Sequence, residues 1–229
     1  MIKIINLLPE LLGTYGDQGN AATLAWRLAQ RGISNQVIHA SAHADIPVDG
    51  DFYLLGGGED DAQIAAVELL RKNNVLQSAL SNGAQIFAVC AGFQLLGQTF
   101  PASGGRNIEG LGLLPVVTES ANSRSVGELL MDSTLGIGAL TGFENHGGKT
   151  NLGSGITPLG RVITGHGNGS SGVDGAVVDN IFGTYLHGPV LARNPEFADL
   201  LLERAVGHVL PRVNDPLADE FAQLRRSKI

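Results

Sequence analysis

The stretch that decides the fold is "IFAVCAGFQLLG", residues 86–97, which holds the only cysteine among 229 residues. Small and apolar residues precede Cys90, and an alanine, a glycine and a helix-like apolar pattern follow it. This order predicts a buried strand that turns sharply into a helix, with Cys90 at the turn. A lone cysteine more often packs as a small hydrophobe. At the N-terminus of a helix, however, the thiolate is favoured, so we interpret Cys90 as a nucleophile.

Strands and helices alternate around this turn. Strands are expected at 2–8, 36–40, 51–58 and 84–90, and helices at 19–32, 60–73 and 92–98. The alternation predicts an α/β fold with a mostly parallel central sheet flanked by helices. Ligands of such sheets bind beyond the carboxyl ends of the strands. Both the glycines at 56–58 and Cys90 lie at such ends.

The pattern changes between residues 107 and 187, where short strands alternate with glycine turns. These strands are expected at 111–118, 141–146, 161–165, 175–180 and 181–188. Two helices, at 195–207 and 215–229, end the chain. We therefore predict a catalytic domain over residues 1–207 and a helical tail over residues 208–229. The tail either docks on a partner or is mobile.

Composition excludes several classes of protein. The formal net charge is −7 and the longest basic cluster is "RRSK" at 225–228, which argues against a nucleic-acid partner. A single cysteine forms no intrachain disulfide, as is usual in a reducing compartment. The N-terminus lacks the features of a secretory signal, and no stretch reaches the roughly 20 apolar residues of a membrane span. The expected location is the cytoplasm.

A thiol nucleophile needs a base, and the chain has six histidines. His187 ends the apolar segment "IFGTYLHGP" (181–189), so its imidazole is expected at a strand end, as Cys90 is. His146, in "GFENHGG", is the alternative base. His39 and His43 are too few to form a zinc site, so no metal is expected. We predict that His187 is the base.

Three motifs give a family resemblance: "LLGGGEDD" (54–61), "VCAGFQLLG" (89–97) and "YLHGP" (185–189). Together they resemble class I glutamine amidotransferases. The His-Gly pair is typical of the subgroup of cobyric and cobyrinic acid amidases. Nearly the whole chain resembles the glutaminase subunits of lipid II isoglutaminyl synthases, with "YGDQGNAATLAWRLAQRGI" (15–33), "GGGEDDAQ" (56–63) and "TGFENHGGKT" (141–150) as the most specific pieces.

The resemblance implies a reaction. Cys90 attacks the side-chain amide of glutamine, ammonia leaves, and water hydrolyses the thioester to glutamate, while His187 moves the protons. The backbone amides of Ala91 and Gly57 are expected to stabilise the oxyanion. Arg124 stands where the family has an arginine that binds glutamine, and Gln94 matches a residue that lines the pocket. Judged without the resemblance, Arg124 is a solvated loop charge and Gln94 an ordinary residue of a first helical turn.

One departure from the family concerns the residue that orients the histidine. Pro189 stands where relatives carry an acidic residue, two places after His187. Asp17, in the loop "YGDQGN" (15–20), is a candidate replacement from another strand end. A helix N-cap is an equally good interpretation of Asp17. Glu144 is a weaker candidate.

The chain is not expected to bind a cofactor. "GGKT" (147–150) lacks the first P-loop glycine because Phe143 stands there, and "GNGSSG" (167–172) leads into a strand. Since the amidotransferase pattern starts at the N-terminus, ATP and Mg²⁺ are expected on a separate subunit. The resemblance implies a Mur-ligase-like, ATP-dependent synthetase that forms a heterodimer with this chain and amidates the D-glutamate of lipid II to D-isoglutamine during peptidoglycan synthesis.

Two alternatives stay open at this point. The chain could be a glutaminase subunit for a different synthetase, such as one of the cobyric-acid type. It could also be a catalytically silent binding module on the same fold. Retention of both Cys90 and His187 argues against the silent module.

Overall fold

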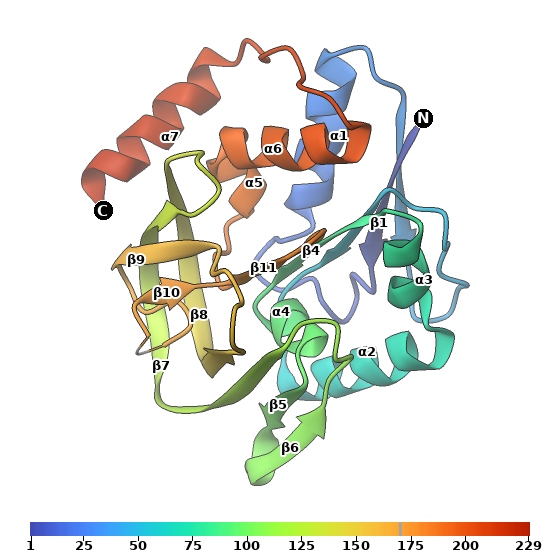
Figure 1. Cartoon of the computed structure of the whole chain (residues 1–229), viewed down its shortest axis with the longest axis vertical. Coiled ribbons are helices and arrows are strands. Elements are labelled where there is room, and N and C mark those ends of the chain that lie inside the picture. The colour runs from blue at the N-terminus through green and yellow to red at the C-terminus, as the bar shows by residue number, and fades with distance from the viewer. Residues whose placement is uncertain (170) are drawn as a thin grey trace.

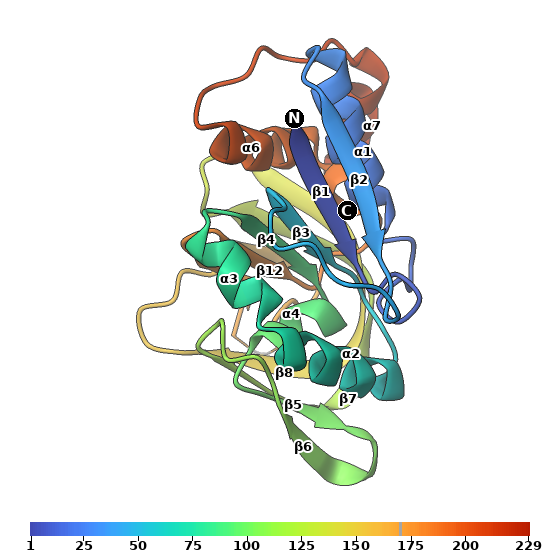
Figure 2. The ribbon, with the colours of Figure 1, turned by 90° about the vertical axis from the view of Figure 1, so that its right-hand side faces the viewer.

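The computed structural model describes residues 1–169 and 171–229. Its centre is a six-stranded sheet in the order β11–β12–β4–β3–β1–β2 (β11 is labelled in Figure 1 and the other strands in Figure 2). Neighbouring strands are parallel, except that β11 at the edge runs antiparallel to β12. The predicted α/β fold is confirmed. The strands are β1 (Ile2–Leu7), β2 (Asn35–Ala40), β3 (Phe52–Leu55), β4 (Gln85–Val89), β11 (Ala176–Val178) and β12 (Ile181–Thr184).

Helices cover both faces of this sheet (Figures 1 and 2). One group consists of α1 (Gly19–Gln30), α5 (Val190–Arg193) and α6 (Pro195–Val206). The other group consists of α2 (Asp60–Asn73), α3 (Val75–Ser81) and α4 (Ala91–Leu96). Both layers bury apolar side chains of the strands, as parallel sheets require.

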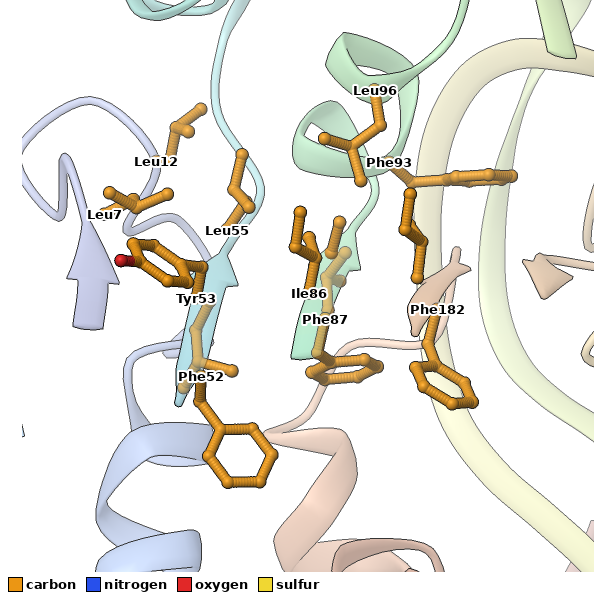
Figure 3. Packing of buried hydrophobic residues seen from close by; sticks show 14 of the residues in the cluster. Leu7, Leu12, Phe52, Tyr53, Leu55, Ile86, Phe87, Phe93, Leu96 and Phe182 are labelled. Atoms are coloured by element: carbon orange, nitrogen blue, oxygen red, sulfur yellow. The ribbon is translucent and has the colours of Figure 1, made fainter. Parts of the chain in front are cut away.

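Aromatic residues fill the core between the sheet and the first helical layer. Phe52, Phe87 and Phe182 lie on three different strands and point to the same side (Figure 3). The ring of Phe197, on α6, packs on Phe87 at 5.6 Å and on Phe182 at 6.2 Å between centroids. Phe93 of α4 lies on the opposite face (Figure 3). Strand β4, which leads into Cys90, is therefore packed on both of its faces.

A second, largely antiparallel sheet follows in the order β10–β9–β7–β5–β6, with β8 paired to β7. An antiparallel bridge between Phe143 and His187 joins β8 to the segment that follows β12. The two sheets therefore meet where the histidine lies. The strands are β5 (Thr99–Ala102), β6 (Arg106–Glu109), β7 (Val116–Ser133), β8 (Ala139–Leu152), β9 (Gly160–Thr164) and β10 (Val173–Asp174).

The expected strand at 111–118 is wrong over most of its length, because β7 begins only at Val116. It then continues to Ser133 through a polar segment for which we expected no element. Most side chains between Glu119 and Glu128 are partly or fully exposed, so the segment lacks the apolar alternation that marks a strand. The β5–β6 hairpin and the short helices α3 and α5 were also missed.

The chain ends in helix α7 (Pro216–Lys228), which lies along the outside of β8 and the α5–α6 layer (Figure 1). The side chain of Asp215 accepts a hydrogen bond from the amide of Ala218 at 3.1 Å and caps this helix. Across residues 1–169 and 171–229, no helix combines the length and the apolar character needed to cross a membrane. The division of the chain at residue 207 stays a prediction.

Candidate active site

Cys90 forms the turn between β4 and α4 and has a backbone conformation that is rare for a residue with a side chain. Its φ is +53° and its ψ is −109°. A strained backbone conformation of this kind persists only where neighbouring residues hold it in place. The amide of Cys90 donates to the carbonyl of Thr184 on β12 at 2.8 Å, and its carbonyl accepts from the amide of Gln94 at 3.0 Å. The strand–turn–helix geometry is therefore present as the sequence predicts.

Two glycines let three segments meet at this turn. A Cβ on Gly92 would lie 2.6 Å from Cβ of Leu55, so α4 can approach β3 only without a side chain there. A Cβ on Gly57 would lie 2.8 Å from Cε1 of His187 and 3.7 Å from Cβ of Cys90. Gly57 thus provides the space in which cysteine and histidine come together.

Asp17 and His187 form a buried pair. Oδ2 of Asp17 lies 2.9 Å from Nδ1 of His187, and both side chains are almost fully buried. Since an ionised carboxylate only accepts hydrogen bonds, Nδ1 of His187 is the donor. The N-cap of α1 is Gln18, and its side chain makes no capping bond. Of the two interpretations of Asp17, the geometry favours the partner of His187 over the helix cap.

The other ring nitrogen of His187, Nε2, makes no hydrogen bond of normal geometry with the described residues and is available to the thiol of Cys90. Burial of the ring disfavours its charged form and acts to lower its pKa. The hydrogen bond to Asp17 and the interaction with Cys90 outweigh burial and raise the pKa of His187 to about 10. The imidazole is therefore protonated at neutral pH.

Cys90 lines an inner chamber of about 60 Å³, together with Ala91 and residues from the 15–20 loop, the β3–α2 turn and the β7–β8 hairpin. An outer cavity of about 390 Å³ shares four lining residues with this chamber. The shared residues are Asp60, Gln94, Arg124 and Gly147. The thiol therefore lies at the inner end of a site that widens outward.

Both predicted substrate-binding side chains line these two spaces. Arg124 lies in β7 rather than in a loop, and its Nε donates to Oδ1 of Asn145 at 2.5 Å. Gln94 is buried, donates from Nε2 to the hydroxyl of Tyr185 at 3.0 Å, and accepts from Nε2 of Gln63 at 3.0 Å. The placement agrees with their predicted roles, which stay predictions.

The placement of Gly57 departs from its predicted role. Its amide donates to Oδ2 of Asp17 at 2.9 Å and so holds the carboxylate that holds His187. Gly58, the next residue, lines the inner chamber beside Cys90 and Ala91. Three consecutive glycines are equivalent in the sequence, so only the tertiary structure distinguishes the one that faces the thiol.

The alternative base and the weaker carboxylate candidate belong to a neighbouring cluster. His146 lines the inner chamber, but its ring stacks on Tyr185 at 3.8 Å between centroids. Glu144 lies 3.5 Å from Nε2 of His146 and 3.0 Å from Nδ1 of His166. Burial raises the pKa of Glu144, but hydrogen bonds from both histidines and from two backbone amides outweigh it and hold the pKa below its usual value. Neither residue bonds to His187.

Tyr15 was missed by sequence reasoning. Its ring lies 4.8 Å from the ring of His187, and its hydroxyl accepts a hydrogen bond from Nδ2 of Asn145 at 2.7 Å. Its φ is +63°, a strained value for a tyrosine. Asn145 is hydrogen-bonded to both Tyr15 and Arg124, so these three residues form one connected group along the wall of the chamber. Both Tyr15 and Asn145 lie inside segments that carry the family resemblance, but no role was expected for either, because their roles depend on contacts over more than a hundred positions.

In the part of the chain that the structure describes, no group of three or more His, Cys, Asp or Glu side chains could hold a metal ion. "GGKT" (147–150) lies inside strand β8 and not before a helix. The segment 167–172 contains Ser170, which lies outside the described residues.

Comparison with known proteins shows the family of the chain. Residues 3–195 match the CobB/CobQ-like glutamine amidotransferase domain. Over 89% of this chain and 84% of the relative, the chain is 36% identical to the lipid II isoglutaminyl synthase (glutamine-hydrolyzing) subunit GatD of Staphylococcus aureus strain N315. The identity to the subunit of the same name from Streptococcus pneumoniae strain R6 is 35%, over 97% of this chain and 89% of that relative.

A solved structure described as a glutamine amidotransferase shares the fold. It superposes with a TM-score of 0.60 over 89% of this chain and 99% of that chain, at 20% identity. At this identity the likeness concerns the fold alone. The matches in sequence, which cover most of the chain and most of its relatives, show the family. The chain belongs to the CobB/CobQ-like glutamine amidotransferases.

Proposed function

We propose that this chain is the glutaminase subunit of a lipid II isoglutaminyl synthase. It hydrolyses L-glutamine to L-glutamate and supplies the released ammonia to a synthetase subunit. The observation that carries the hydrolytic part is the buried Asp17–His187 pair beside Cys90, at the inner end of the site. The names of two relatives that match most of the chain support the assembly.

The geometry supports the following reaction. The sulfur of Cys90 attacks the side-chain amide carbon of glutamine, and the backbone amides of Ala91 and Gly58, which line the inner chamber with Cys90, stabilise the negative charge that develops on the oxygen. Protonated His187 gives its proton to the leaving nitrogen, which departs as ammonia and leaves a γ-glutamyl thioester on Cys90. His187 then takes a proton from water as the water attacks the thioester. Glutamate leaves, and the site returns to its starting state.

Asp17 and Gly57 are positioning residues in this scheme. Asp17 fixes the ring of His187 with Nε2 toward the sulfur, and the amide of Gly57 fixes Asp17. Losing one oxyanion donor typically lowers the rate about 100- to 1000-fold. The position of the thiol relative to the amides of Ala91 and Gly58 is therefore also important for the rate.

The partner in this proposal is a Mur-ligase-like, ATP-dependent synthetase that forms a heterodimer with this chain. ATP and Mg²⁺ bind to the partner, which activates the D-glutamate carboxyl of lipid II and uses the ammonia to form D-isoglutamine. We place the reaction in the cytoplasm, where ATP is available to the partner. On this chain, the partner docks on the outer face of α7, where Leu217, Phe221 and Leu224 are exposed.

Glutamate release from glutamine tests the proposal, with the chain measured alone and together with the synthetase. Cys90→Ala and His187→Ala are each expected to reduce glutamine-dependent glutamate release to background, because one removes the nucleophile and the other the proton carrier. Both variants should still support amidation of lipid II by the complex when ammonium chloride replaces glutamine.

Each possible outcome distinguishes the proposal from one alternative. Glutamate release without amidation of lipid II by the complex would point to a different synthetase. Absence of release from the wild type, with and without the partner, would favour the silent binding module. Failure of ammonium to bypass the two variants would refute the transfer of ammonia from this chain to its partner.

A further inference from the structure

Two opposite charges lie at the junction of the inner chamber and the outer cavity. The family resemblance already assigns Arg124 to glutamine binding. We propose that Asp60 binds the α-ammonium group of L-glutamine while its α-carboxylate lies at Arg124, so that Asp60 selects free α-amino acids as substrates. The inference rests on the proposed glutaminase function and names the head-group site within it.

The sizes of the two spaces determine where the head group lies. Binding sites for small molecules usually occupy about 300–1,000 Å³. The inner chamber of about 60 Å³ therefore holds only the amide end of glutamine, next to Cys90. The head group must lie farther out, where the chamber meets the cavity of about 390 Å³. The four residues that line both spaces mark this position.

The chemistry of these four residues singles out two of them. Gly147 has no side chain, and the amide of Gln94 is occupied by Tyr185 and Gln63. Asp60 and Arg124 remain, one acidic and one basic. Free glutamine carries one carboxylate and one ammonium group at neutral pH. A guanidinium suits a planar carboxylate, and a carboxylate is the natural acceptor for an ammonium.

Arg124 and Asp60 are held on separate elements. Arg124 lies on β7, where Asn145 accepts from its Nε at 2.5 Å and from its Nη2 at 3.3 Å. Asp60 is the first residue of α2 and lines both spaces from that helix. Since Asn145 and not Asp60 holds the guanidinium, the Asp60 carboxylate stays available to a ligand.

Glu59 and Asp61 flank Asp60 but do not share its position. Glu59 lines only the inner chamber, where the uncharged amide of glutamine has to lie. Asp61 lies in the same first turn of α2 and lines neither space. Asp61→Asn is therefore a matched control, since it removes the same charge from the same helix terminus.

The experiment compares L-glutamine with glutaramate, which has the same amide and carboxylate but no α-ammonium group. Asp60→Asn is expected to raise the KM for glutamine about 10- to 100-fold, as the loss of a hydrogen bond between charged groups predicts. It should change the KM or the inhibition constant of glutaramate less than about twofold. Arg124→Ala should weaken both compounds, and Asp61→Asn neither.

Several results would overturn the inference: equal effects of Asp60→Asn on the two compounds, no effect on glutamine, or a selective loss of glutamine binding in Glu59→Gln instead. Calorimetric binding of both compounds to the same variants separates this inference from the proposed function. Binding of glutamine that depends on Asp60, in a wild type that releases no glutamate, would refute the proposed function alone. Circular dichroism of each variant checks its fold.

Discussion

At the scale of single residues, the site shows how a carboxylate can be supplied from a different part of the chain. Pro189 occupies the position where the resemblance predicts an acidic residue. It packs against Gly19, where an added Cβ would lie 2.3 Å from Cγ of the proline. This contact holds the start of α1 beside the end of β12, and the preceding loop presents Asp17 to His187.

We predict that the Asp17–His187 bond sets the alkaline limit of the reaction. Burial alone would lower the pKa of His187, and the bond to Asp17 is the largest contribution that raises it to about 10. Asp17→Asn should therefore lower this pKa, and the imidazolium that protonates the leaving nitrogen would be lost at a lower pH. We expect kcat/KM for glutamine to fall at least about tenfold at pH 8, with its alkaline limb moved to lower pH.

A pH profile of kcat/KM for wild type and variant checks this expectation. Glu144→Gln is the control, because Glu144 is a buried carboxylate that contacts other histidines. An unchanged alkaline limb in Asp17→Asn would contradict the role of Asp17 as the partner of His187.

The sequence predicted some of these residues better than others. Cys90 and His187 follow apolar strands, and a strand that ends in a polar residue is visible in one sequence. Asp17 stayed undecided, because a loop carboxylate before a helix also fits an N-cap. Tyr15 and Asn145 lie in segments that carry the resemblance, but their roles were not predicted, since they depend on contact between the N-terminal loop and the β7–β8 hairpin.

At the scale of elements, the β7–β8 hairpin brings three residues of the site together. Arg124, Asn145 and His146 all line the inner chamber from this hairpin. The pairing of β7 with β8 shifts register between Ser120 and Ser125, next to Arg124. Such an irregularity redirects side chains in a sheet. The exposed polar sequence around Arg124 suggests a loop because the pairing that makes it a strand is not local.

Helix α7 offers a face with no cover in the described chain. Leu217, Phe221 and Leu224 follow one side of the helix and are 60%, 46% and 42% exposed. If the synthetase docks there, Phe221→Ser should weaken its binding at least about tenfold, since a buried aromatic often contributes strongly to an interface. The rate of glutamate release by the isolated chain should not change.

Titration calorimetry with the purified synthetase measures this effect. Gln223→Ser is the matched control, because Gln223 is an exposed polar residue of the same helix. Equal affinity of wild type and Phe221→Ser would exclude this face of α7 as the docking surface.

At the scale of the whole molecule, a buried carboxylate links the two sheets. Asp174, on β10, accepts hydrogen bonds from the hydroxyl of Thr184 at 2.5 Å and from the amide of Tyr185 at 3.2 Å. Thr184 in turn accepts the amide hydrogen of Cys90 through its carbonyl. The second sheet is therefore connected through Asp174 to the turn that holds the nucleophile.

This carboxylate makes stability depend on pH. Burial raises the pKa of Asp174 from 3.8 to about 6, although its hydrogen bonds act in the opposite direction. The folded state then binds the proton more tightly than the unfolded state. Stability from this group is present below about pH 4 and is lost as the pH rises to about 6, with a total of about 3 kcal/mol.

Asp174→Asn should remove this contribution. The free energy of unfolding of the variant should decrease less than that of wild type between pH 4 and 6, and the variant should be at least as stable above pH 6. Urea unfolding at several pH values, followed by circular dichroism, measures the difference. Parallel curves for the two proteins would show that the carboxylate is ionised in the folded state throughout this range.

The general architecture follows from the sequence, whereas the arrangement of the second sheet does not. Alternating apolar strands and helices predicted the central sheet, because each strand there is short, apolar and followed by a turn. The order β10–β9–β7–β5–β6 depends on pairings between strands of which several are short and some lie far apart in the sequence. Such long-range pairings leave no trace in local periodicity.

The small size of the inner chamber has a consequence for chemical labelling. The chain carries a single thiol, so any cysteine reagent that modifies it reports on this one place. With a compartment of about 60 Å³, we expect compact alkylating agents to reach the thiol faster than bulky maleimide dyes. An electrophile that carries an amino-acid head group should be selective for this thiol, because both its shape and its charges match the surroundings of Cys90.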